Sequence, residues 1–237
     1  LSEGARMQPA PRTALIVAHG QPSDPGPAAA EIAALAAKVA PHLPGWRVRA
    51  ATLAEDGALP HEIAAAGAPG LVYPLFMAGG WFTQTNLPRR LAAAGGQGWR
   101  IAAPFGTDPA VTDLAVTLAR EALAKTPAPA ILLAAHGSFR SPAPAEVARA
   151  CAARLASALG LPCEAGFIDQ TPRIAEIART MPDALCLPFF AARGGHVVED
   201  LPTALASADF RGRVLPPLGL DPRVPALIAA AIRAAAA

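Results

Sequence analysis

The sequence has few of the features that mark several large classes of protein. Its three cysteines form no Cys-x-x-Cys pair, so neither a disulfide framework nor a cysteine-ligated structural zinc site is expected. It has two lysines, a net charge of +2 and no basic run, which argues against nucleic-acid binding. No apolar stretch is long enough to cross a membrane, and residues 1–12 lack the pattern of a secretory signal. We therefore expect a cytoplasmic protein with no nucleic-acid or membrane partner and with reduced, mostly buried thiols.

Several catalytic motifs are also missing. The sequence contains no GxxxxGK[ST] for a phosphate-binding loop and no GxSxG for a serine hydrolase. The GGQG at 95–98 lacks a third glycine at the spacing that a dinucleotide fold requires. These absences argue against ATP-driven, hydrolytic and nicotinamide chemistry.

What the sequence does have is an internal repeat. The segment TALIVAHG at 13–20 recurs as AILLAAHG at 130–137. The segment YPLFMAGGWFTQTNLPRRL at 73–91 recurs without a gap as LPFFAARGGHVVEDLPTAL at 187–205. A repeated unit of this length is the size of a small α/β domain, so the chain is expected to consist of two similar halves.

Short apolar runs alternate with alanine-rich helical stretches along both halves. Strands that alternate with helices of this length indicate βαβ units and parallel sheets. We therefore predict an α/β protein with two halves, residues 13–125 and 130–237, each a four-stranded parallel sheet flanked by helices. The expected strands are 13–18, 47–53, 71–76 and 100–104 in the first half, and 130–135, 163–168, 184–190 and 213–216 in the second. The expected helices are 28–40, 58–66, 86–94, 109–124, 144–159, 172–180, 201–207 and 222–235.

The two halves differ in their histidines. His19 and His136 occupy equivalent positions after the first strand of each half, but His196 in the second half corresponds to Phe82 in the first. Asp169 follows the second strand of the second half. Because the carboxyl ends of parallel strands border the ligand crevice of such sheets, we expect His136, Asp169 and His196 to converge on one edge.

These three side chains suit a metal ion. Imidazole and carboxylate groups bind Co²⁺, Fe²⁺, Ni²⁺ or Zn²⁺, and three ligands leave open coordination positions. Glu199, three residues after His196, is a candidate fourth ligand or proton acceptor, whereas Asp200 is expected to cap the next helix. A single histidine in such a position is more often structural than a ligand, so the prediction depends on the two histidines occurring together with Asp169.

Residues near the histidines are candidates for binding a ligand. Gly194 and Gly195 would let the backbone approach a flat molecule, although a simple turn also explains them. Ser138 and Arg140 could bond a carboxylate, although capping also explains Ser138. Arg193 has the fork geometry for a carboxylate and could equally be solvated.

The two AHG strand ends, the acidic residue after the second strand and PFF…GGHVVEDLP resemble the class II tetrapyrrole chelatases of the CbiX and SirB type, over residues 13–235. The resemblance implies ATP-independent insertion of Co²⁺ or Fe²⁺ into sirohydrochlorin, for cobalamin or sirohaem, with no permanent cofactor. It implies that His136 and His196 handle the metal and that Asp169 is an acidic ligand. The first half carries GGWFTQTNLP in place of the histidine-bearing loop, so the resemblance places the site in the second half.

Two alternatives stay open at this point: a tetrapyrrole or metal carrier derived from a chelatase, and a structural α/β protein. The sequence is compatible with a monomer or a homodimer. Trp81 and Phe82 would either line a tetrapyrrole cleft or fill the space of the missing histidine.

Overall fold

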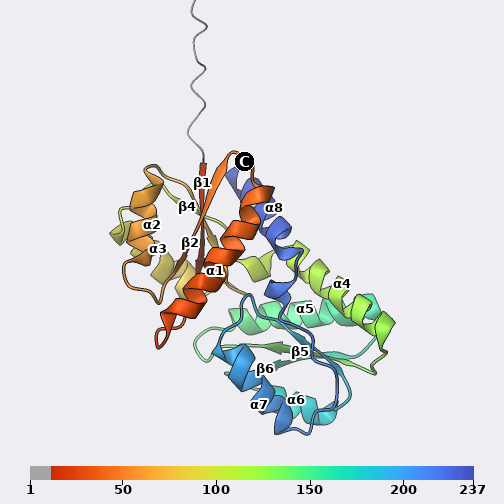
Figure 1. Cartoon of the computed structure of the whole chain (residues 1–237). Helices are drawn as coiled ribbons and strands as arrows, with labels where there is room; N and C mark the ends of the chain where they lie inside the picture. Colours follow the sequence, from red (N-terminus) through yellow and green to blue (C-terminus); the bar gives the residue numbers. More distant parts are fainter. Residues whose placement is uncertain (1–11) are drawn as a thin grey trace, which may run out of the picture.

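The computed structural model describes residues 12–237, which form two parallel β-sheets with helices on their faces (Figure 1). Residues 1–11, where the sequence shows no secretory signal, lie outside the described residues. The first sheet has the order β2-β1-β3-β4, with β1 (Arg12–Ala18), β2 (Trp46–Thr52), β3 (Leu71–Pro74) and β4 (Arg100–Ile101). The second has the order β6-β5-β7, with β5 (Ile131–Ala135), β6 (Cys163–Phe167) and β7 (Leu185–Pro188).

The α/β fold with two similar halves is confirmed, but the fourth strand of the second half is not. The predicted strand 213–216 is reduced to a single bridge between Val214 and Cys186, so the sheet within the described residues has three strands. Proline at 216 and 217 explains the difference, because proline cannot donate to a strand ladder. The backbone still makes two bonds here, from Cys186 N to Arg213 O and from Leu215 N to Cys186 O.

The central strands are apolar on both faces, as parallel strands between two layers of helices must be. All five residues of β5 are buried, as are Ala14 to Ala18 of β1. One core that includes Ile16 and Leu133 joins the facing sides of the two sheets, and a smaller core lies on the outer side of each sheet. The thiols of Cys151 and Cys186 are free and buried, and burial raises the pKa of each to about 12.

The observed helices match the predicted stretches closely. Gly160, in the left-handed conformation at φ +66°, ends α5, and the Asp108 carboxylate begins α4 by accepting from Ala110 N at 2.9 Å. No helix of the described chain is long and apolar enough to span a membrane. The helices are α1 (Pro25–Val39), α2 (Ala58–Ala66), α3 (Leu87–Ala93), α4 (Pro109–Lys125), α5 (Ala143–Leu159), α6 (Ile174–Thr180), α7 (Leu201–Ala206) and α8 (Val224–Ala236).

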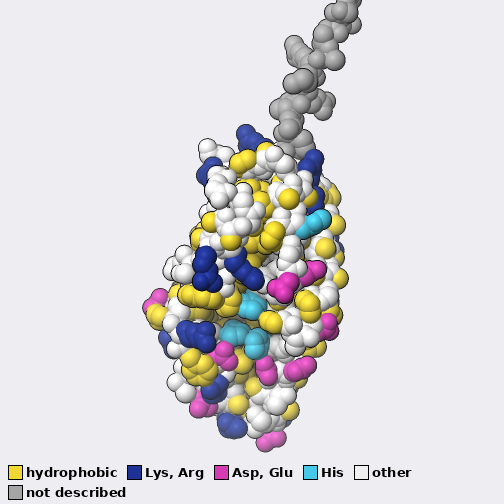
Figure 2. All heavy atoms as spheres, turned by 90° about the vertical axis from the view of Figure 1, so that its left-hand side faces the viewer, with side chains coloured by type: hydrophobic (Ala, Val, Ile, Leu, Met, Phe, Trp, Pro, Cys, Tyr) yellow, Lys and Arg dark blue, Asp and Glu magenta, His cyan; other side chains and the backbone are white. Residues whose placement is uncertain are grey.

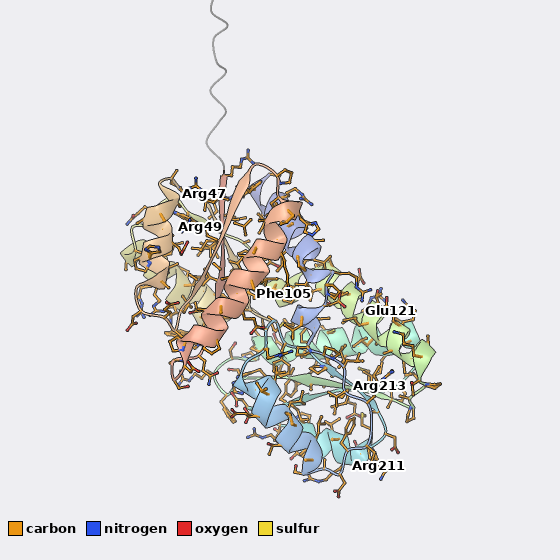
Figure 3. The ribbon with its side chains drawn as sticks, in the orientation of Figure 1. Arg47, Arg49, Phe105, Glu121, Arg211 and Arg213 are labelled. Carbon is orange, nitrogen blue, oxygen red and sulfur yellow. The ribbon has the colours of Figure 1, made fainter. Side chains whose placement is uncertain are left out.

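The two halves exchange their last helices. Helix α8 packs beside α1 of the first half, and α4 packs beside α5 of the second half (Figure 1). An arginine holds the end of each exchanged helix. Arg100 donates to Ala235 O. Arg213, labelled in Figure 3, donates to Ala122 O at 2.5 Å. A chain cut at 126–130 would therefore leave each half without the helix that covers it, although the boundaries 13–125 and 130–237 follow the repeat in sequence.

Candidate metal centre

His136 lies directly after β5, at the carboxyl edge of the second sheet. The next residue, Gly137, has φ +73°, and a Cβ atom there would come within 2.8 Å of the Gln170 side chain and 3.0 Å of Phe167. Only glycine fits this turn, which brings Gly137 O to 2.9 Å from His136 Nδ1. The backbone at the end of β5 therefore orients the His136 ring.

His196 follows β7 and begins a π-helical turn, His196–Asp200, that runs directly into α7. Its Nδ1 atom lies 2.6 Å from Asp200 Oδ2, four residues along the turn. The expectation that Asp200 caps α7 was wrong, because Asp200 makes no capping bond. Its backbone is helical at φ −71° and ψ −43°, whereas a capping residue has extended backbone, so the carboxylate is directed to His196 instead.

The two histidines meet through their outer nitrogens. The Nε2 atoms of His136 and His196 lie 2.8 Å apart, with the rings nearly perpendicular at 86°. Both Nδ1 atoms face oxygen acceptors, so we assign the proton of each neutral ring to Nδ1. The two Nε2 lone pairs then lie close together, where both are available to one divalent ion as neighbouring ligands.

Asp169 lies behind His136 and not beside the Nε2 atoms. Its Oδ2 atom is 3.4 Å from His136 Nδ1, the nitrogen that also faces Gly137 O. Within residues 12–237 no group of three or more His, Cys, Asp or Glu side chains is arranged to hold a metal ion. The metal-ligand role of Asp169 stays a prediction, and its position behind the ring suits a carboxylate that orients the imidazole.

The catalytic role of Glu199 also stays a prediction. Glu199 is exposed in the turn beside Asp200, and its carboxylate makes no hydrogen bond within the described residues. Such an exposed carboxylate is accessible to a ligand. Asp200 was predicted as a cap and not as a partner of His196, although its spacing of four from His196 is the signal for side chains that meet along a helical turn.

The residues predicted to bind a substrate lie on the loops that carry the pair, and their binding roles stay predictions. Ser138 Oγ accepts from Arg140 N at 3.1 Å, so the serine stabilises the turn after His136. The Arg140 side chain is exposed, and so is Arg193, whose backbone N donates to Glu31 Oε1 of α1 at 2.8 Å. A Cβ atom on Gly194 would meet nothing within 4 Å, so the space beside it is open.

Gln170 is a second residue that the sequence reasoning missed. Its Oε1 atom accepts from Ser138 N at 2.8 Å, which ties the loop after β5 to the loop after β6. A lone glutamine carries no spacing signal, so the sequence offered no means of finding it. The loop that carries His136 is thus fixed at Gly137 and at Ser138.

The first half repeats this arrangement with one imidazole replaced. His19 Nδ1 lies 2.9 Å from Gly20 O, and His136 Nδ1 lies at the same distance from Gly137 O. The Phe82 ring lies 4.3 Å from the His19 ring at 71°, close to the 4.2 Å between His136 and His196. Phe82 therefore fills the position that His196 has in the second half, and the first half has no histidine pair.

The two equivalent sites adjoin each other. A Cβ atom on Gly80 would lie 4.0 Å from Ser141 Oγ, and one on Gly195 would lie 3.9 Å from the Gln21 amide. Loops of the first half thus meet the loops that follow β5 and β7. Figure 2 shows histidine side chains gathered near the middle of one face, with basic and acidic side chains close around them.

The sequence model of the CbiX family matches residues 13–122 and again residues 130–235. The chain belongs to the CbiX family. The double match repeats the pattern that the sequence predicted, and the resemblance to CbiX-type proteins is confirmed. No curated protein sequence matches this CbiX-family chain.

Solved structures agree with the family assignment. A structure described as CbiX, the terminal enzyme for biosynthesis of siroheme in denitrifying bacteria, is 51% identical, covers 94% of this chain and 99% of its own, and has a TM-score of 0.86. The sirohydrochlorin chelatase SirB from Bacillus subtilis subspecies spizizenii, in complex with cobalt, is 18% identical with a TM-score of 0.72 and 95% of each chain covered. SirB from Bacillus subtilis with Fe³⁺ is 16% identical with a TM-score of 0.74 and 96% of each chain covered. The two SirB structures show that the fold is shared.

Proposed function

We propose that this CbiX-family chain is a sirohydrochlorin chelatase, which inserts Co²⁺ or Fe²⁺ without ATP at a site in its second half. The observation that carries the proposal is the 2.8 Å separation of His136 Nε2 and His196 Nε2, with each Nδ1 atom directed to an oxygen. The 51% identical relative is described as the terminal enzyme of siroheme biosynthesis, which supports the same reaction class here. The metal is a substrate, and the protein needs no permanent cofactor.

The histidine pair suits both parts of the reaction, which are the delivery of the metal ion and the removal of the pyrrole protons. Metal insertion requires two pyrrole N–H protons to leave while the metal ion sheds water and enters the ring. Neutral imidazoles can hold a divalent ion or accept those protons. Asp200 and Gly137 O are placed to accept hydrogen bonds from the Nδ1 atoms, an arrangement that directs both Nε2 lone pairs toward the substrate.

The surroundings suit a macrocycle that carries several carboxylates. His136 and His196 are about half exposed, so a flat molecule can reach both Nε2 atoms. The exposed guanidinium groups of Arg140 and Arg193 lie on the loops that carry the two histidines, and a guanidinium pairs well with carboxylates. A cleft that binds the ring in a distorted form would favour the transition state over the flat substrate.

The proposal is tested by mixing the purified full chain with sirohydrochlorin and Co²⁺, or Fe²⁺ under anaerobic conditions, and following the absorbance of the macrocycle. We expect the protein to accelerate the spectral change over the protein-free rate, with no effect of added ATP. Binding of sirohydrochlorin without any acceleration would identify a carrier and contradict the proposal. A protein that binds neither the tetrapyrrole nor the metal would contradict both assignments.

A further inference from the structure

Large apolar side chains are exposed at few places in the part of the chain that the structure describes. They are Trp81, with 48% of its surface exposed, Phe139 with 74%, Val198 with 58% and Val214 with 44%. Val198 lies in the turn of His196, and Phe139 follows His136 by three residues. Exposed apolar groups that gather beside polar functional residues mark a ligand surface.

We propose that Trp81 and Phe139 form two aromatic walls that hold the tetrapyrrole over His136 and His196. The inference rests on the proposed function and adds to it the residues that contact the face of the tetrapyrrole ring. It also gives the first half, which has no histidine pair, a role in binding the substrate. The contacts of both aromatic residues support it.

Phe139 is exposed but fixed in place. The Arg173 guanidinium lies over the Phe139 ring, 5.5 Å from its centroid, and the same arginine donates to Ile168 O at the end of β6. The turn before Phe139 is held by the bond from Ser138 N to Gln170. An exposed aromatic ring with a fixed position loses little conformational freedom when a second ring stacks on it.

Trp81 lies on a loop of the first half that adjoins the loop of Phe139. Its ring packs on Phe82 with centroids 5.0 Å apart, and Phe82 packs on His19. The preceding residue, Gly80, is tied by its N–H to Thr83 Oγ1 at 3.0 Å and faces Ser141, two residues after Phe139. Phe82 therefore fills the missing histidine position, while Trp81, the residue before it, is left exposed at the border between the two halves.

The chemistry of these walls fits a conjugated ring. Aromatic rings prefer to pack with centroids about 4.5–7 Å apart, and an apolar face leaves the carboxylate edges of the ligand free for guanidinium groups. The Nε2 atoms of the histidine pair would then face the pyrrole nitrogens while the aromatic side chains contact the ring surface. A small hydrated metal ion offers no surface for such contacts, so the walls would affect tetrapyrrole binding and not metal binding.

The test uses the full chain and measures binding of metal-free sirohydrochlorin as well as turnover. We expect Trp81→Ala and Phe139→Ala each to raise the Kd and KM for sirohydrochlorin by about three- to tenfold, the loss expected for one aromatic contact. The kcat and the affinity for Co²⁺ should change by less than about twofold, because both substitutions remove contacts that the ground state and the transition state share equally. Trp81→Phe should restore most of the affinity. Val214→Ala, at the bridge to Cys186, is the control for loss of an exposed apolar side chain.

Fluorescence supplies a second measurement. The chain has three tryptophans, Trp46, Trp81 and Trp99, and bound tetrapyrrole should quench Trp81 most strongly. In the folded Trp81→Phe variant, most of the quenching should therefore disappear. Unchanged quenching in that variant would overturn the inference, and so would unchanged Kd and KM in Trp81→Ala and Phe139→Ala. The proposed function would still stand in either case if the wild-type protein chelates the metal. A wild-type protein that neither binds nor metallates sirohydrochlorin would overturn the proposed function itself and, with it, this inference.

Discussion

The Nε2 atoms of His136 and His196 lie 2.8 Å apart although the two residues are 60 positions apart in sequence. Each ring is oriented from behind, His136 by Gly137 O and His196 by the Asp200 carboxylate. Nitrogen ligands bind a first-row divalent ion at about 2.0–2.1 Å, so a small opening of this pair would admit one. The pair is therefore the feature of the molecule on which the predicted chemistry depends.

Loss of either histidine should abolish metal insertion. His136→Ala and His196→Ala should each reduce kcat/KM for Co²⁺ insertion by more than about 100-fold, because each removes one of the two facing nitrogens. His19→Ala should leave the rate within about threefold, since Phe82 occupies the place of its partner. The measurement is absorbance-monitored chelation, and equal losses in all three variants would place the site elsewhere.

The two neighbouring carboxylates of the His196 turn should differ in their roles. Asp200→Asn should weaken Co²⁺ binding by about 10- to 100-fold, because the histidine loses the group that orients it. Glu199→Gln should change Co²⁺ affinity by less than about threefold and lower kcat instead, as expected for a proton acceptor. Calorimetric Co²⁺ titration and single-turnover chelation separate the two effects, and a larger loss of Co²⁺ affinity in Glu199→Gln would reverse the assignment.

The first half should gain a metal site when its missing imidazole is restored. Phe82→His, combined with Asn86→Asp to supply the carboxylate that Asp200 provides in the second half, should raise the Co²⁺ stoichiometry from one to two. The reason is that Phe82 already packs on His19 at nearly the distance that separates the rings of His136 and His196. Phe82→Ala with Asn86→Asp is the matched control and should bind one Co²⁺. A stoichiometry of one in both double variants would contradict the equivalence of the two sites.

The arginines that hold the exchanged helices should contribute more to stability than nearby surface arginines. Arg213 donates to Ala122 O at the end of α4, whereas Arg211 forms an exposed pair with Asp183 (Figure 3). Arg213→Ala should lower the free energy of unfolding by about 1.5–3 kcal/mol, the range for a hydrogen bond from a charged group. Arg211→Ala should lower the free energy of unfolding much less, because exposed ion pairs are screened by water. Urea unfolding gives the free energy of unfolding of both variants. Equal losses of this free energy would show that the contact between Arg213 and α4 is not important for stability.

Much of the fold could be predicted from the sequence because its signals are local. The apolar run of β5 and the glycine that ends α5 each specify their own segment, and the predicted helices match the observed ones closely. The failure at 213–216 has a local cause too, since the prolines that follow Leu215 limit the ladder to a single bridge. The exchange of α4 and α8 was not predictable, because it depends on which of two similar surfaces each helix covers.

The sequence by itself determined that His136, Asp169 and His196 would lie at one edge of the second sheet, because parallel strands end on the same side. It also determined that only the second half can have a histidine pair, since Phe82 cannot replace an imidazole as a ligand. Only the tertiary structure decided which nitrogen each ring presents, and that Asp200 contacts His196 while Asp169 lies behind His136. It also decided that the loop of Trp81 adjoins the loop of Phe139. These relations depend on side-chain orientation and on how the two halves pack, and no local sequence pattern specifies either.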